Sequence, residues 1–177
     1  MLSDPINNKT IYLNIAYGLL NEYKGKGNPE VPHGSVEGII TSIKTVSKTI
    51  NRGTTVYLYI NMKDGDENYL VQVPMYKSAG PNIIRSLKNA LDKGILLGAN
   101  VKIRPYQKER EGLKFTNATL YIGDQKLDWA DIPSGVEIND AIYAMEQELE
   151  RAFSGEVVDD MPPGDGEDHN PFAGFSE

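Results

Sequence analysis

Residues 54–62, TTVYLYINM, alternate strictly between two kinds of side chain, and no other feature of the chain restricts its fold as much. A repeat of two residues is the period of a β-strand that buries one face and exposes the other. We therefore predict a strand here whose outer face carries Tyr57 and Tyr59. Its inner face carries the apolar residues Val56, Leu58, Ile60 and Met62.

Strand patterns recur on both sides of this segment. Residues 10–17 place apolar side chains at alternate positions, although the LLNEY that follows also fits a helical turn. Residues 24–35 are rich in Gly and Pro, which predicts a loop. The apolar positions of 36–50 slip in phase, which predicts one long strand bent by a bulge. Further strands are expected at 69–76, where Pro74 marks either an edge of the sheet or the end of the strand, and at 101–108 and 113–122.

Two segments have helical periodicity instead. Residues 78–94 carry an apolar stripe, with Pro81 in the first turn and Gly94 at the end, so a helix is expected there. A second, amphipathic helix is expected at 139–153. Its apolar face could dock on the sheet or on another subunit.

The order of these elements predicts a fold. A long bent strand, two strands joined as a hairpin, a helix and two more strands follow one another, which is the order of the oligonucleotide/oligosaccharide-binding (OB) barrel. We therefore predict a mainly β protein with a five-stranded OB-fold barrel, a helix between strands three and four, and an extra N-terminal strand. The expected divisions are an OB-fold domain at 1–126, an acidic linker with the amphipathic helix at 127–154, and a disordered acidic tail at 155–177.

Charge is distributed unevenly along the chain. The net charge of −7 argues by itself against a nucleic-acid partner. Residues 1–126, however, hold 17 basic and 11 acidic residues, whereas 127–154 hold one Arg and seven acids and 155–177 hold seven acids and no base. A cationic body with an acidic tail is typical of nucleic-acid interaction, although an acidic tail can also serve solubility alone.

Composition argues against several kinds of chemistry. The absence of cysteine rules out disulfides, thiol catalysis and Cys-based zinc sites, and it fits a reducing cytoplasm. His33 lies in the predicted loop and His169 in the predicted tail, so no His-based triad or metal cluster is expected. We expect no enzymatic activity, cofactor or metal, with catalysis by Asp and Glu alone left open. No basic start followed by an apolar run and no span of about 18 apolar residues occurs, so we expect a cytoplasmic protein without membrane contact.

The paired tyrosines have the chemistry of single-strand binding. Tyr57 and Tyr59 should lie about 7 Å apart on one face of their strand. Unpaired bases of any sequence can stack on such rings. An aromatic pair that only stabilises the sheet fits the same pattern.

Strand 101–108 favours the binding interpretation. Its basic and aromatic side chains alternate with Val101 and Ile103, and a phosphate backbone with unstacked bases requires such a surface. Lysines on edge strands also protect against aggregation, but that role needs neither the arginine nor the tyrosine. Lys24 and Lys26 either close over a bound strand or are simply solvated. The predicted stripe comprises Lys102, Arg104, Tyr106 and Lys108, and Lys44, Lys48, Arg52 and Lys114 are expected to extend it.

The acidic C-terminal segment, EVVDDMPPGDGEDHNPFAGFSE, completes this pattern. Here the chain resembles the acidic-tailed single-stranded DNA-binding proteins of bacteria and bacteriophages, whose OB barrel precedes a flexible acidic segment that ends in an aromatic residue. The resemblance implies a tail that recruits replication and repair enzymes and competes with DNA for the barrel. Five residues follow Phe172 here, so no aromatic residue carries the terminal carboxylate. By resemblance the partner-binding residues are Asp159, Asp160, Asp165, Glu167, Asp168, Pro171, Phe172 and Phe175.

These observations together predict a non-enzymatic single-stranded DNA-binding protein. It would coat and protect unpaired DNA during replication, recombination or repair, in a bacterial cell or a phage-infected host. Its partners would be single-stranded DNA and, through the tail, replication or recombination proteins, with a homo-oligomer possible. The alternative is an OB-fold adaptor that binds a protein, or an RNA-binding module.

Overall fold

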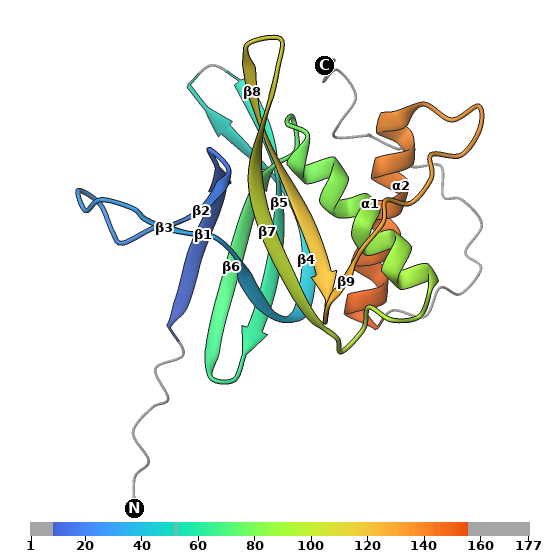
Figure 1. The fold of residues 1–177 in the computed structure, drawn as a ribbon, viewed down its shortest axis with the longest axis horizontal. Coiled ribbons are helices and arrows are strands. Elements are labelled where there is room, and N and C mark those ends of the chain that lie inside the picture. Colours follow the sequence, from blue (N-terminus) through green and yellow to red (C-terminus); the bar gives the residue numbers. More distant parts are fainter. Residues whose placement is uncertain (1–8, 52, 156–177) are drawn as a thin grey trace, which may run out of the picture.

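The computed structural model describes residues 9–51 and 53–155, which form a mainly β structure with two helices (Figure 1). The strands predicted from alternation and the two predicted helices are all present among these residues. In chain order the elements are β1 (Thr10–Ala16), β2 (Leu19–Glu22), β3 (Val31–His33), β4 (Val36–Ile50), β5 (Gly53–Asp64), β6 (Glu67–Pro74), α1 (Ala79–Asp92), β7 (Asn100–Arg110), β8 (Leu113–Ile122), β9 (Gln125–Lys126) and α2 (Ile138–Ser154).

The described strands form one sheet in the order β3-β2-β1-β6-β5-β4-β7-β8-β9. β4, β5 and β6 follow one another in the chain, and each pairs antiparallel with the next, so they form a meander. β4 pairs on its other side with β7, which forms a hairpin with β8. The order of these elements along the chain, three strands, a helix and two strands, is the order that the sequence predicts.

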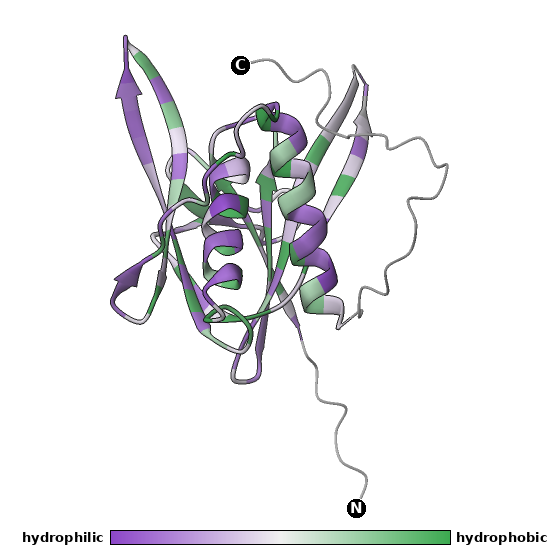
Figure 2. Ribbon diagram, turned by 90° about the vertical axis from the view of Figure 1, so that its right-hand side faces the viewer, coloured by the Kyte–Doolittle hydropathy of each residue, from purple (hydrophilic) through white to green (hydrophobic). Residues whose placement is uncertain are grey.

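β4 joins the two halves of the sheet. Its pairing with β5 shifts register between Ile40 and Ser42, which confirms the predicted bulge. At Gly38 the backbone of β5 comes close, since an added Cβ would lie 2.8 Å from the carbonyl oxygen of Lys63. Beyond this region the β4–β5 and β7–β8 hairpins form two arms that diverge, one on each side of the helices in Figure 2.

The sheet is open, so the predicted five-stranded OB-fold barrel is not confirmed. Closure would need β6 to pair with β8, but β1 occupies the free edge of β6 in parallel pairing, with Leu13 opposite Val71. The two halves of the sheet approach each other at the turn between β1 and β2. There the amide of Gly18 donates a hydrogen bond of 3.1 Å to Oγ1 of Thr116 on β8. The alternation of 10–17 predicts the strand correctly, but it does not specify which edge the strand joins.

The segment after β1 is a strand, so the alternative of a helical turn for LLNEY is wrong. Tyr17 and Gly18 have φ angles of 54° and 75°, and two-residue hairpin turns favour positive φ at both central positions. The predicted loop 24–35 also contains the short strand β3, where Pro32 lies opposite Asn21 at the edge of the sheet. An outer strand tolerates the missing N–H of proline.

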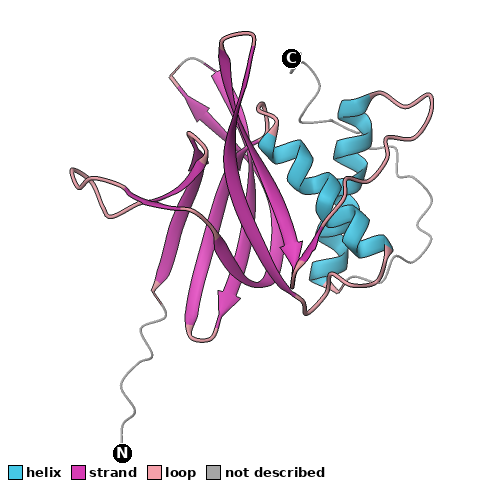
Figure 3. Cartoon of the chain, in the orientation of Figure 1, coloured by secondary structure: helices cyan, strands magenta, loops and turns pink. Residues whose placement is uncertain are grey.

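Both helices lie on the same side of the sheet (Figure 3). The apolar stripe of α1, with Ile83, Ile84 and Leu87, is fully buried in the core. α2 packs against β4 and α1 of its own chain, which answers the question of where this amphipathic helix docks. No helix among the described residues is long and apolar enough to cross a bilayer.

Candidate nucleic-acid interface

The face of β5 opposite the core carries the predicted tyrosines. Val56, Leu58 and Ile60 are at most 3% exposed, so alternation turns Tyr57 and Tyr59 to the other side. The pairing of β5 with its neighbours places Lys44 beside Tyr59 on one strand and Gln72 beside it on the other. We call this side of β4, β5, β6 and β1 the outer sheet face, and the helices cover the opposite side.

Lys48 connects three strands across this face. From β4 its side chain reaches over β5, where Nζ lies 5.1 Å from the ring centroid of Tyr57 and 5.2 Å from that of Tyr59. The same atom donates a 2.8 Å hydrogen bond to Oε1 of Gln72 on β6. Both rings are half-buried, although alternation alone predicts that they are exposed. The ammonium group and both rings thus form one cation–aromatic cluster.

The outer sheet face continues onto β1 and β2. Nε2 of Gln72 lies 3.5 Å from Oδ1 of Asn14. Asn14 is two residues after Tyr12 on β1, so the two side chains lie on the same face of the strand. Tyr12 and Tyr23 are 52% and 56% exposed, and they line a pocket of about 310 Å³ together with Asn14 and Gln72. Two further aromatic side chains therefore lie on the face that carries Tyr57 and Tyr59.

Tyr12 and Tyr23 are missing from the residues predicted from sequence. The alternation that turns Leu13 and Ile15 inward also turns Tyr12 outward, so the signal for that residue is present in 10–17. Tyr12 lies on the same face as Gln72 and the β5 tyrosines only because β1 pairs in parallel with β6, and no local sequence pattern reveals that pairing. Tyr23 joins the face because its amide bonds to the carbonyl oxygen of Tyr12 over 3.0 Å.

The predicted stripe on β7 lies on the second arm. Val101 and Ile103 are completely buried, and the alternate residues face outward, as predicted. In the pairing with β8, the outward residues Lys102, Arg104, Tyr106 and Lys108 lie opposite Tyr121, Thr119, Asn117 and Phe115, in that order. β7 and β5 belong to different arms (Figure 2), and β7 pairs with β4 only at Val36–Ile39. The stripe consists of Lys102, Arg104, Tyr106 and Lys108.

Lys114 is not part of this stripe. It pairs with Glu109, whereas Lys108 pairs with Phe115, so Lys114 lies on the other face of the hairpin. That face is the one where Thr116 receives the hydrogen bond from Gly18. The expectation that Lys114 extends the stripe is therefore wrong, because a shift of one residue along a strand reverses the face.

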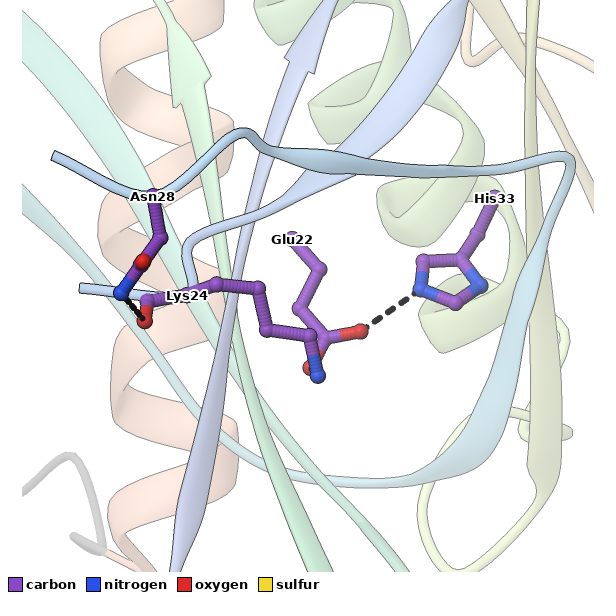
Figure 4. A network of polar contacts seen from close by, with 4 residues as sticks. All are labelled: Glu22, Lys24, Asn28 and His33. Carbon is purple, nitrogen blue, oxygen red and sulfur yellow. Dashed lines mark hydrogen bonds and ion pairs between the residues drawn. The ribbon is translucent and has the colours of Figure 1, made fainter.

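The loop with the remaining predicted cations is held by its own contacts. Nζ of Lys24 lies 2.6 Å from Oε1 of Glu22, and Nε2 of His33 lies 2.7 Å from Oε2 of the same carboxylate (Figure 4). Hydrogen bonding to Lys24 and then to His33 lowers the pKa of Glu22 below its ordinary value. The Lys24 carbonyl accepts a 3.0 Å hydrogen bond from Asn28. These contacts favour an ordinary solvated loop over one that closes on a ligand.

Several predicted residues lie outside the described part of the chain. Arg52 and all the tail residues assigned to partner binding, Asp159 to Phe175, are among them. Within residues 9–51 and 53–155, no three His, Asp or Glu side chains gather as a metal site would require.

Comparison with known proteins gives no match: no protein family, no curated protein and no solved structure resembles the chain significantly. No relative therefore supplies a role for any residue. The chemistry of the outer sheet face and of the β7 stripe has to be derived from their own geometry.

Proposed function

We propose that this protein binds single-stranded DNA on the outer sheet face. One observation carries the proposal: the ammonium group of Lys48 lies over Tyr57 and Tyr59 at once and is held there by Gln72. A strand of unpaired nucleotides needs aromatic surfaces for its bases and cations for its phosphates, and this cluster offers both within three adjacent strands.

Binding would exchange one set of contacts for another. In the free protein Lys48 covers the two rings. When a strand arrives, its bases would stack on Tyr57 and Tyr59, and the ammonium group would move to a phosphate, where the charge is better neutralised. Lys44, which is exposed beside Tyr59, would provide a second phosphate contact. Tyr12 and Tyr23 would continue the stacking surface toward the edge formed by β1 and β2.

The strand pairings support an OB-type origin for the central sheet. β4 pairs with both β5 and β7, β5 with β6 and β7 with β8, and α1 joins β6 to β7. We propose that these five strands are an OB-type unit in which β1 takes the place of the closing partner of β6. The acidic tail would compete with DNA and recruit replication, recombination or repair proteins in the cytoplasm of a bacterial or phage-infected cell.

Fluorescence anisotropy with labelled oligonucleotides tests this function. The full chain is titrated with oligo-dT, with a duplex of equal length and with oligo-U of equal length. We expect much tighter binding to oligo-dT than to duplex, since stacking requires unpaired bases. Equal affinity for duplex would contradict the proposal, and clear preference for oligo-U would redirect it to RNA. Tyr57→Phe, which keeps the ring, serves as the matched control for Tyr57→Ala.

A further inference from the structure

A pocket beside the β7 stripe contains the only tryptophan of the chain. Trp129 lies in the segment after β9, and it shares a pocket of about 320 Å³ with Tyr106 of the stripe. This volume lies at the lower end of the range for ligand pockets. Ser86 of α1, Thr119 of β8, Lys126 and Asp128 supply polar groups to its wall. Of the residues that line this pocket, only Tyr106 belongs to the predicted site, and the pocket is not part of the outer sheet face.

The tryptophan is fixed on both sides along the chain. Before it, the amide of Leu127 donates a 2.9 Å hydrogen bond to the carbonyl oxygen of Leu120, and the Leu127 side chain is only 4% exposed. After it, Ala130 and Arg85 exchange two hydrogen bonds: the Ala130 amide donates to the Arg85 carbonyl over 3.0 Å, and Nε of Arg85 donates to the Ala130 carbonyl over 2.9 Å. The position of Trp129 is therefore set before any ligand arrives.

The indole ring remains accessible in this fixed position. The guanidinium carbon of Arg85 lies 5.2 Å from the ring centroid, yet Trp129 is 45% exposed, and Tyr106 is 37% exposed. A large aromatic side chain that is held rigidly and left half-exposed loses little entropy when a planar group stacks on it. A positive charge against the ring adds a cation–π contact that stabilises the side chain where it stands.

Charge around the pocket selects the kind of ligand. Arg104 lies two residues before Tyr106, on the same face of β7. Its partner on β8 is Thr119, which lines the pocket. Arg104 and Lys126 together offer two cations for a phosphate group. Asp128 offers a carboxylate, which accepts hydrogen bonds from an exocyclic amino group such as that of cytosine.

We infer that this pocket binds one unstacked nucleotide of a single strand that runs along the β7 stripe, with the base on Trp129, its amino group on Asp128 and its phosphate on Lys126 and Arg104. The inference rests on the proposed binding of single-stranded DNA. It adds a second contact region to the outer sheet face, at a place where the two arms have already diverged.

Because Trp129 is unique, its fluorescence reports on this pocket alone. Unlabelled oligo-dC or oligo-dT is titrated into the full chain, with emission recorded under selective excitation of tryptophan and anisotropy of labelled strands measured in parallel. We expect binding to quench Trp129, and oligo-dC to bind about tenfold more tightly than oligo-dT because only cytosine has an amino group for Asp128. Asp128→Asn should remove most of this difference, and Lys126→Ala should weaken the quenching titration more than the charge-matched Lys93→Ala at the C-terminal cap of α1.

The two proposals fail in different ways. If oligonucleotides bind by anisotropy but leave the Trp129 emission unchanged, the pocket assignment is wrong and the outer sheet face still stands. If quenching occurs with equal affinity for oligo-dC and oligo-dT, the role of Asp128 is overturned. If no oligonucleotide binds at all, both the proposed function and the pocket assignment are wrong. Trp129→Phe, which keeps an aromatic ring, should bind more weakly than the unchanged chain yet unfold at a similar temperature.

Discussion

Nζ of Lys48 lies 2.8 Å from Oε1 of Gln72, and the strand between them carries two tyrosines. The lysine thus spans β5 and holds its charge over the rings of Tyr57 and Tyr59 in the absence of any ligand. This contact joins the aromatic and cationic parts of the candidate site.

Lys48→Ala should reduce both the affinity for oligo-dT and its dependence on salt. Loss of one phosphate contact to a single strand should reduce the slope of log K against log salt by about 0.7. Anisotropy titrations at several salt concentrations measure this slope. Lys93→Ala removes the same charge from the helix side and should leave it unchanged. Equal slopes for Lys48→Ala and the unchanged chain would exclude a phosphate contact at this residue.

Replacing either tyrosine of β5 by alanine should weaken binding to oligo-dT. The expected cost is about 1–3 kcal/mol for each ring that stacks a base. Both rings also contact Lys48, so each substitution should lower the free energy of unfolding, but only by about 1 kcal/mol. Chemical denaturation separates the two effects. Normal binding together with early unfolding would show that the rings only stabilise the sheet.

Stability should depend on pH through Glu146 of α2. Its side chain is fully buried, with Oε1 unpartnered among the described residues and Oε2 accepting a 2.7 Å hydrogen bond from Gln147. Burial raises the pKa of Glu146 to about 7; the hydrogen bond from Gln147 opposes this shift, and the neighbouring Glu150 carboxylate adds to it.

The sign of this effect follows from proton binding. Between pH 4.5 and about 7 the folded chain keeps a proton on Glu146 that the unfolded chain has lost, so the free energy of unfolding falls as pH rises through this window. The loss should reach about 3 kcal/mol and end above the folded pKa. Glu146→Gln should be more stable than the unchanged chain at pH 8 and similar to it near pH 4, by urea denaturation. The exposed Glu109→Gln should show no such difference.

Gly18→Ala should destabilise the protein more than Gly27→Ala. Both glycines have positive φ, 75° and 82°, so both substitutions carry the same kind of backbone strain. A Cβ on Gly18 would in addition lie 2.9 Å from the amide nitrogen of Gln107, whereas nothing lies within 4 Å of one on Gly27. The extra cost should be about 1–3 kcal/mol. Thermal melts of the two variants that coincide would show that the β1–β2 turn does not press on β7.

Removal of residues 156–177 should raise the affinity for oligo-dT at low salt. The segment carries seven acids and no base, and as a covalently attached competitor it would act at a high effective concentration. The gain should shrink as salt screens both competitors. Phe172→Ala with Phe175→Ala keeps the charge, so it should spare DNA affinity and abolish capture of replication proteins. Unchanged affinity on truncation would leave the tail a solubility segment.

The sequence predicts those parts of the fold that depend on local periodicity. Alternation in β5 and β7 assigns inner and outer residues correctly, and the slip in phase at Ile39 and Ile40 corresponds to the observed bulge. The apolar stripe of α1 is likewise local. Each of these patterns lies within a single strand or helix, so it can be recognised without knowing which distant segments the element contacts.

The arrangement of the site depends instead on pairings between distant segments. β1 joins the edge of β6 in parallel, across more than fifty residues of chain, and thereby brings Tyr12 to the face of Tyr59. Arg104 belongs to the β7–β8 arm and the two tyrosines to the β4–β5 arm, although both strands were predicted correctly. Trp129 acquires its position from backbone hydrogen bonds to β8 and α1, and hydrophobic patterning has no signal for such contacts.

The open sheet also affects how copies of this chain meet one another. A sheet that does not close leaves two outer strands whose unpaired amides and carbonyls can template the addition of a strand from another molecule. Here these strands are β3, with three residues, and β9, with two. Pro32 at the middle of β3 has no amide hydrogen to offer. These two terminal strands therefore present little edge to another molecule, whereas β4 after Ile39 and β8 before Tyr121 have longer edges that pair with no described strand and are the places where another chain could add.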